Sequence, residues 1–337
     1  MNQKNKHITF FVLLAISLLI YAFGEVSTSP MPLSIPEGWQ KPAYDFSKNP
    51  LTKEGFELGR HLFYDPLLSR DQTISCSSCH LQATGFTHVD HELSHGIDDK
   101  LGTRNSMTLI NLAWSKHFMW DGGVNHLDVQ PLAPLNSPVE MDESLENVVK
   151  KLKSSLKYRT LFFNAFGDSL ATGQKVLLAF SQFLLQLQSS NSRYDKHIRN
   201  EEGGDFTAQE INGLRLFRIH CASCHPEPLF TTNGFAKNGL SIDTTLNDFG
   251  RMQITQNPQD SLKFKVPTLR NIQFTFPYMH DGRFKKLREV LNHYSSTTQL
   301  SQPILLSAEE KVDLIAFLLT LSDREFLFDK RFGFPRE

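Results

Sequence analysis

Hydrophobic residues recur at three- and four-residue spacing over several parts of the chain, which is the pattern of amphipathic helices. Capping boxes at Thr207–Glu210 and Ser307–Glu310 mark two helix starts, because Ser or Thr followed by Glu satisfies amides of the first turn. No stretch alternates cleanly between apolar and polar residues, so the pattern predicts an all-α fold with long loops and little or no sheet. The residues expected to face inward are Leu145, Val148, Val149, Leu152 and Leu156 in a helix opened by Asp142, Val176, Leu177, Phe180, Leu184 and Leu187 in a second helix, and Val312, Ile315, Ala316 and Leu319 in a third.

Composition and charge narrow the class of protein. The chain has 337 residues, of which 40% are hydrophobic and 21% charged, an ordinary globular composition that excludes collagen, coiled coil and disorder. This length predicts two domains. The formal net charge of −1 offers no basic excess for nucleic acid, so that class of partner is excluded.

The first 24 residues resemble a signal peptide. Lys4 and Lys6 precede an apolar run from Ile8 to Phe23, and Ala22 and Gly24 supply small residues at a cleavage site. The run is shorter than the roughly 20 residues of a membrane-spanning helix. We therefore expect an exported, periplasmic protein, with an uncleaved membrane anchor as the alternative. Residues 25–50 are rich in proline and predict an extended arm.

Four cysteines carry the strongest chemical signal. They stand in two Cys-x-x-Cys-His pentads, Cys76 to His80 and Cys221 to His225, and the chain has no other cysteine. Two thiols at this spacing, followed by a histidine, are typical of covalent attachment to a c-type haem whose iron the histidine binds. Three alternatives are weaker. A four-cysteine zinc site would leave both histidines idle, a thioredoxin-like pair lacks its βαβ context, and local disulfides leave the histidines unexplained.

The segments around the pentads repeat in the same order. This pattern predicts two related haem domains that arose by duplication, over residues 51–203 and 204–337, with a polar joint at 189–205. The matching blocks are Gly59–Phe63 with Gly213–Phe217, Phe86–Thr87 with Phe230–Thr231, Thr108–Asn111 with Thr268–Asn271, and Phe118–Gly122 with Tyr278–Gly282.

Together these blocks, with Val139–Met141 and Pro277–Gly282, resemble the bacterial di-haem cytochrome c peroxidases, a superfamily that includes the MauG-type enzymes of methylamine utilisation. The resemblance extends from about Leu51 to Asp323. It implies two cytochrome c-like domains, a peroxide-reactive haem in the N-terminal domain and an electron-transfer haem in the C-terminal domain.

For the first haem, the resemblance implies Glu140 as distal carboxylate, Gln130 as distal amide and Trp120 as electron path between the haems. Cleavage of the O–O bond requires a proton to move from one peroxide oxygen to the other, which a carboxylate can carry out. An amide can orient peroxide by hydrogen bonding. Without the family, Glu140 would be an exposed acid before a helix and Trp120 a core aromatic residue. His95 matches a loop histidine that binds this iron in resting peroxidases, with His88 and His91 as rivals in the same loop.

For the second haem, Tyr294 stands where the best-known peroxidases place a methionine ligand, which resembles the MauG-type branch. The rivals are Met279 and His293. An anionic phenolate stabilises higher oxidation states than a thioether does.

Other positions match supporting sites of the family. His280 is expected to hydrogen-bond near the second haem. Arg104 and Arg270 are expected to pair with haem propionates, with surface arginines as the alternative. The positions that match a calcium site between the domains are Asn105, Thr275 and Pro277.

The leading hypothesis is a di-haem peroxidase that reduces hydrogen peroxide with electrons from a small donor protein, either a c-type cytochrome or a cupredoxin. The alternative is a MauG-like oxidase that uses peroxide to oxidise a partner protein or an organic substrate. An electron carrier is a third class, which Glu140 and Gln130 argue against. Homodimers are common in the family, although no sequence feature marks an interface.

Overall fold

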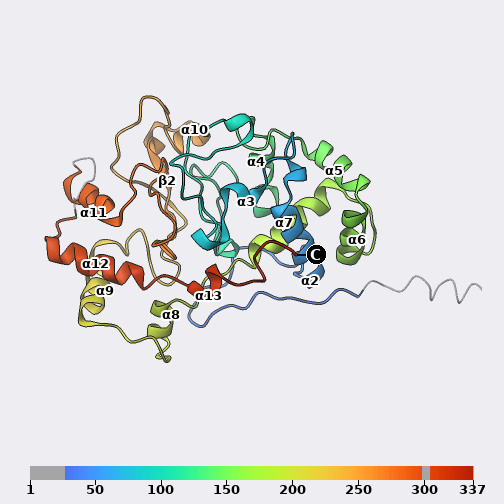
Figure 1. Ribbon diagram of the computed structural model, residues 1–337. Helices are drawn as coiled ribbons and strands as arrows, with labels where there is room; N and C mark the ends of the chain where they lie inside the picture. Colours follow the sequence, from blue (N-terminus) through green and yellow to red (C-terminus); the bar gives the residue numbers. More distant parts are fainter. Residues whose placement is uncertain (1–26, 298–303, 337) are drawn as a thin grey trace, which may run out of the picture.

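A computed structural model describes residues 27–297 and 304–336 (Figure 1). The expected signal peptide lies outside these residues. Helices dominate, and the two short strands β1 (Phe235–Lys237) and β2 (Lys263–Lys265) pair antiparallel, with Ala236 opposite Phe264. The prediction of a helical fold with little sheet is thus confirmed. The helices are α2 (Lys53–Tyr64), α3 (Cys76–Cys79), α4 (Leu132–Asn136), α5 (Leu145–Ser154), α6 (Leu156–Phe166), α7 (Gly173–Leu185), α8 (Arg193–Ile198), α9 (Ala208–His220), α10 (Met252–Thr255), α11 (Leu287–Ser296), α12 (Ala308–Leu319) and α13 (Arg324–Leu327).

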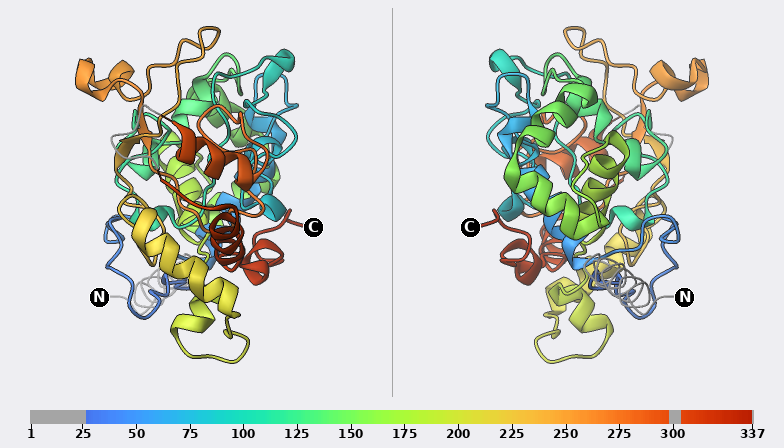
Figure 2. Two further views of the ribbon diagram at one scale, coloured as in Figure 1. Left: turned by 90° about the vertical axis from the view of Figure 1, so that its left-hand side faces the viewer. Right: turned by 90° about the vertical axis from the view of Figure 1, so that its right-hand side faces the viewer.

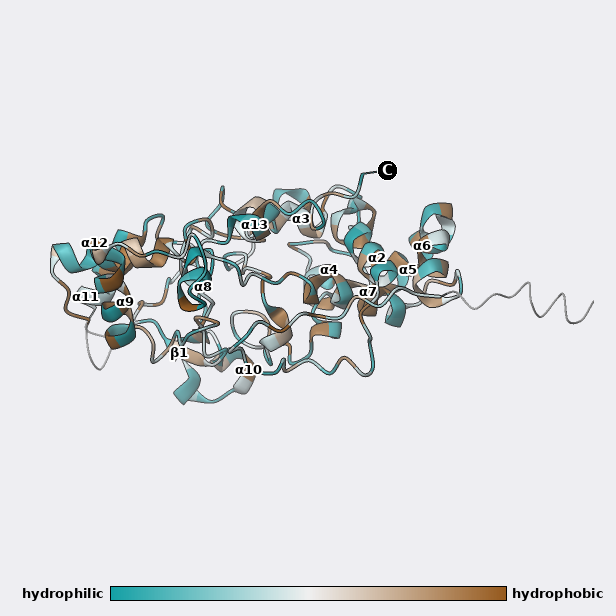
Figure 3. Ribbon diagram, turned by 90° about the horizontal axis from the view of Figure 1, so that it is seen from below, coloured by the Kyte–Doolittle hydropathy of each residue, from teal (hydrophilic) through white to brown (hydrophobic). Residues whose placement is uncertain are grey.

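The two halves of the chain lie side by side, with α5, α6 and α7 at one end and α9, α11 and α12 at the other (Figure 1, Figure 2). Helices in both halves carry hydrophobic as well as hydrophilic residues, brown and teal in Figure 3, as expected where one face is buried. Long irregular segments connect them and surround the two pentads.

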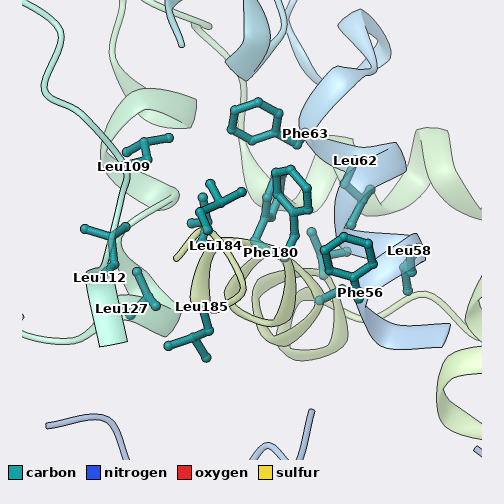
Figure 4. Packing of buried hydrophobic residues seen from close by; sticks show 14 of the residues in the cluster. Phe56, Leu58, Leu62, Phe63, Leu109, Leu112, Leu127, Phe180, Leu184 and Leu185 are labelled. Atoms are coloured by element: carbon teal, nitrogen blue, oxygen red, sulfur yellow. The ribbon is translucent and has the colours of Figure 1, made fainter. Parts of the chain in front are cut away.

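Each half contains a pair of packed helices that meet at a glycine. In the first half α2 packs on α7, and a Cβ added at Gly59 would lie 2.0 Å from the carbonyl oxygen of Ala179. In the second half α9 packs on α12, and a Cβ at Gly213 would lie 2.0 Å from the carbonyl oxygen of Asp313. The glycine of each Gly-x-x-Leu-Phe block therefore allows two backbones to approach closely. Figure 4 shows the first of these cores, with Leu62 and Phe63 near Phe180 and Leu184.

Corresponding loop positions also share backbone conformations. Asn111 and Asn271 have φ of 57° and 59°, and Met119 and Met279 have φ of 67° and 76°. Each of these pairs occupies the same place in its repeated block.

The hydrophobic clusters do not follow the expected boundary at residue 203. Tyr194 already packs in the C-terminal cluster, whereas Phe326, Leu327 and Phe332 return to the N-terminal one. Residues of the N-terminal arm bridge the halves, because Trp39 packs against Trp114 at 4.9 Å and against the guanidinium of Arg270 at 4.8 Å.

Two expectations about helices are wrong. The helix expected from Asp142 to Leu156 is two helices, because Ser155 ends α5 and its hydroxyl caps α6 by accepting from the amide of Tyr158. Leu156 is consequently exposed. The prediction of which face of α12 is buried is also wrong, because Val312 and Leu319 are exposed. The buried residues are Leu314, Phe317 and Leu318, and α12 packs against α9.

Candidate functional site

The first pentad forms the single helical turn α3, with Ser75 as its N-cap residue. Cys76 and Cys79 are free thiols, and burial raises the pKa of Cys76 to about 12. His80 follows, and its Nδ1 lies 2.8 Å from the carbonyl oxygen of Phe86. This carbonyl requires the proton to be on Nδ1, so Nε2 has a free lone pair for a metal. Burial lowers the pKa of His80 to about 4, which keeps the ring in the neutral form that binds metals.

A cavity of about 570 Å³ opens beside this pentad. Cys76, Cys79 and His80 contribute to its wall, and so do Gln130 and Glu140. The remaining wall is mostly apolar, as is usual for cofactor sites. Thiols, a neutral imidazole and an apolar wall in one cavity fit a haem attached through the cysteines. The other lining residues are Phe63, Ile74, Ser75, Leu109, Pro131, Pro134, Met141, Phe180 and Leu184, four of which are labelled in Figure 4.

Glu140 is held in place at this cavity through its backbone. Its carbonyl accepts from the amide of Ile97 at 2.9 Å. Gly96 packs so tightly here that an added Cβ would lie 2.5 Å from the Cα of Glu140. Burial raises the pKa of Glu140, although a hydrogen bond from Ser137 opposes the shift. Gln130 ends the short turn Leu127–Val129, and its Nε2 lies 3.7 Å from the sulfur of Met119.

The second pentad has the same local geometry. The His225 Nδ1 lies 3.1 Å from the carbonyl oxygen of Phe230, and burial lowers the pKa of His225 to about 4. Tyr294, on α11, lies near this pentad. Burial raises the pKa of its phenol, and the nearby thiols of Cys224 and Cys221 add to the shift.

The two rivals of Tyr294 differ in their surroundings. His293 Nε2 lies 2.8 Å from the carbonyl oxygen of Asn238, so this ring is already bound to backbone on the other side. Met279 occupies a turn position with positive φ. Tyr294 as the second ligand stays a prediction, which its position near both thiols supports.

Trp120 lies at the junction of the halves and is buried. Its Nε1 donates to the carbonyl oxygen of Asn105 at 2.8 Å, and its own carbonyl accepts from the amide of Lys265 at 2.7 Å. It therefore contacts a segment of each half directly.

The two arginines expected at haem propionates both have protein partners, and their pairing with propionates stays a prediction. Arg270 is fully buried and forms both bonds of a bidentate pair with Asp195, at 2.7 and 2.8 Å. Arg104 binds Asp248 at 2.6 Å and Asp121 at 2.5 Å, which makes it a link between the halves. Each guanidinium already has carboxylate partners from the protein.

His280 stacks on Phe264, with ring centroids 3.6 Å apart, and its buried Nδ1 has no hydrogen-bond partner in the described part of the protein. Its main-chain oxygen accepts from the amide of Asn105 at 2.7 Å. The ring is thus close to the junction and has one nitrogen available.

His95 lies at the rim of the first site. Its ring stacks on His91 at 5.1 Å and approaches Asp99 at 3.5 Å, and it is not among the residues that line the cavity. His88 stacks on the other side of His91 at 4.9 Å. The role of His95 as a resting ligand therefore stays a prediction and would need the loop to turn inward.

The three residues expected at a calcium site lie near the junction. Asn105 donates from Nδ2 to the carbonyl oxygen of Glu92 at 3.0 Å. Thr275 lies against Gly85, and Pro277 follows it closely in the chain. Among residues 27–297 and 304–336 no group of three His, Cys, Asp or Glu side chains could hold a metal ion. Calcium at this place stays a prediction.

The sequence patterns did not identify two residues that lie where the two halves of the chain meet. Asp248 is the partner of Arg104, and Lys265 is buried in β2. A lysine between the apolar residues Phe264 and Val266 in a strand was the available signal for the second, whereas Asp248 lies in a long loop that carries no pattern.

A helical chain with two haem-type pentads, one of which shares a cavity with a glutamate and a glutamine, has the features of a di-haem peroxidase. The family described as "Di-haem cytochrome c peroxidase" matches residues 53–203. The methylamine utilization protein MauG of Methylorubrum extorquens is 35% identical over 291 residues, covering 81% of this chain and 79% of that protein. The cytochrome c551 peroxidase of Nitrosomonas europaea is 33% identical, covering 79% of each.

Solved structures agree with this result. A MauG-like protein associated with microbial copper homeostasis superposes with a TM-score of 0.81 at 30% identity, covering 90% of this chain and 99% of that one. The chain therefore belongs to the di-haem cytochrome c peroxidase family, whose members include MauG. Its relatives are haem-containing oxidoreductases that act on peroxide. No helix in the described ranges has both the length and the apolar character needed to cross a bilayer.

Proposed function

We propose that this protein is a periplasmic di-haem peroxidase that reduces hydrogen peroxide to water at the first pentad. The haems would be attached through Cys76 and Cys79 and through Cys221 and Cys224, as two thioether-bound c-type groups. His80 and His225 would be their axial ligands. The observation that carries this proposal is the single cavity in which Cys76, Cys79 and His80 meet Gln130 and Glu140.

The bound haem would supply the redox centre at which peroxide accepts electrons. The Glu140 carboxylate takes the proton from one peroxide oxygen and returns it to the other, which leaves as water. Its raised pKa suits this exchange, because a buried carboxyl group gains and loses protons nearer to neutral pH than an exposed one. The Gln130 amide donates to peroxide and orients it. Two electrons and two protons complete the conversion of one peroxide to two waters, and Trp120 lies on the path between the halves.

A second candidate function is supported by Tyr294. A MauG-like enzyme would use peroxide to oxidise a protein or organic substrate instead of drawing electrons from a small donor. Tyr294 lies near Cys221 and Cys224, and its phenolate, if bound to the iron of the second haem, would stabilise the oxidised forms of that haem.

Replacing Tyr294 by phenylalanine is expected to change the absorption spectrum and lower the stability of the oxidised form of the second haem only. The matched variant is Met279→Leu, which removes the rival ligand. Spectra of the oxidised protein and a reductive titration would be recorded for both. A change in Met279→Leu with none in Tyr294→Phe would reverse the assignment.

The proposed function is tested by iron content and turnover. Protein from a host that attaches c-type haems should contain two irons per chain and consume peroxide when a reduced small c-type cytochrome or cupredoxin is supplied. Rapid loss of peroxide without oxidation of either donor, leaving a long-lived oxidised protein, would favour the MauG-like alternative. Colourless folded protein from that host would exclude both.

We also propose that the two haem domains arose by duplication. The paired glycines 59 and 213, the paired left-handed residues and the matching bonds of His80 and His225 support this. The core clusters favour a boundary between Leu187 and Tyr194 in place of residue 203. A calcium ion at Asn105, a His95-ligated resting state and a homodimer remain proposals from the family alone.

A further inference from the structure

A second cavity, of about 380 Å³, lies between the two pentad sites and has no role in the function proposed above. Its walls come from both halves of the chain, and they include Met107 and Pro267. The backbone groups of these two residues lie close enough to the rings of His80 and His225, respectively, to affect their pKa values. The cavity is therefore close to both expected haem ligands.

Lys265 brings a buried positive charge to this cavity. Its side chain is only 7% exposed, and Nζ donates to Oδ1 of Asn233 at 3.1 Å. The same oxygen accepts from the hydroxyl of Ser115 at 2.8 Å, and all three residues line the cavity. An ammonium has three donor hydrogens, of which Asn233 takes one. No ion pair in residues 27–297 and 304–336 includes Lys265, so the remaining donors face no anionic side chain.

The charges around Lys265 are also positive. The pKa of His117 is lowered by burial and by the nearby Arg251, Lys265 and Lys116. Burial lowers the pKa of Lys265 to about 8, so the ammonium is mostly protonated at neutral pH. A buried ammonium without a counter-charge is costly, and an anion in the adjoining cavity would remove that cost.

We propose that the Lys265 ammonium, which Asn233 and Ser115 hold in place, binds a carboxylate group in this cavity, and that the carboxylate is a propionate of one haem. This inference rests on the proposed haem content. It names a propionate partner other than Arg270, which already donates to Asp195 and Pro228. A free organic carboxylate has the same chemistry, so the test must separate the two sources.

The test uses haem-loaded protein and does not depend on turnover. Lys265→Met removes the charge at nearly constant length, and Lys263→Met is the matched control, because Lys263 lies in the same strand and pairs with Asp260 at 3.0 Å. Loss of a buried positive charge beside a haem should lower its reduction equilibrium constant by about tenfold, or ~59 mV for one electron. Midpoint potentials and the propionate bending band in resonance Raman spectra would be measured.

The two sources give different results. With a propionate, Lys265→Met moves both the potential and the Raman band, and added acetate has no effect on the wild-type protein. With a free carboxylate, acetate lowers the wild-type potential saturably, Lys265→Met abolishes that response, and the Raman band stays unchanged. In this second case the carboxylate site stands but its assignment to a propionate is overturned.

A second variant keeps the proposal testable if the Lys265→Met protein does not bind haem. Asn233→Asp places a carboxylate beside Lys265 at constant volume and should lower the potential in the same direction by displacing the bound group. If both variants match Lys263→Met in potential and Raman band, and acetate has no effect, the site is overturned. Iron content and peroxide consumption of the wild-type protein are measured on the same samples, so a failure of the proposed function is recognised separately.

Discussion

Replacing Glu140 by glutamine is expected to slow the reaction with peroxide by about 10²–10⁴-fold, the usual contribution of a positioned general acid–base group. The amide has nearly the same shape but cannot carry a proton between the two peroxide oxygens. The backbone of residue 140 should remain in place, because Ile97 and Gly96 hold it through main-chain contacts. The rate of peroxide consumption would be measured in rapid mixing at fixed haem content.

The pH dependence gives this prediction a second readout. The carboxylate acts first as a base, so wild-type activity should fall as the pH drops through the pKa of Glu140. Since burial raises this pKa, the fall should occur at a higher pH than for an ordinary glutamate. The glutamine variant should lose this limb of the profile.

The matched control is Asp142→Asn, which changes a nearby carboxylate that pairs with Arg70 at the surface. Its rate should stay close to that of the wild-type protein. If the Glu140→Gln variant had a normal rate and an unchanged acid limb of the pH profile, Glu140 would not be the group that transfers the proton.

What could be predicted from sequence depended on how local the signal was. The pentads and the capping residues Thr207 and Ser307 act within a few residues, and the structure has helices starting directly after both caps. The buried face of α12 could not be predicted, because Val312 and Leu319 are as hydrophobic as Phe317 and only the position of α9 decides between them.

Partners of charged residues were the least predictable part of the site. Arg270 was expected at a propionate, yet Asp195 lies 75 positions away in sequence and no pattern links the two. Glu140 and Gln130 were identified through the family, and it is the cavity that brings them into one place with His80. Lys265 was overlooked because a single lysine in a short strand is usually exposed.

Breaking the pair between Arg270 and Asp195 is expected to destabilise the C-terminal half by about 3–5 kcal/mol, the usual cost of leaving one partner of a buried ion pair alone. The Arg270 side chain is fully buried and also donates to the carbonyl oxygen of Pro228 at 2.7 and 2.9 Å. Arg270→Met would leave the Asp195 carboxylate buried without a counter-charge, with the amide and hydroxyl of Ser192 as its remaining donors. Urea unfolding of the haem-loaded protein, followed by circular dichroism, would measure the loss.

The acid dependence of stability identifies the pair specifically. Burial would raise the pKa of Asp195, but hydrogen bonding and charge from Arg270, with help from Ser192, lower it below its usual value. The stabilisation is therefore complete above the ordinary carboxyl pKa of about 3.9 and is lost as the pH falls through the lowered one. Arg270→Met should weaken this acid dependence.

The control for this prediction is Arg218→Met, which breaks a more exposed pair with Glu227 in the same half and should cost only about 0.2–1 kcal/mol. Because Pro228 lies just after the second pentad, Arg270 also fixes the loop that follows His225. Loss of Arg270 should thus disturb the second haem before the first. Equal losses of stability in the two variants would show that the buried pair stabilises the protein no more than an exposed ion pair does. Arg270 would then not be what fixes the loop after His225.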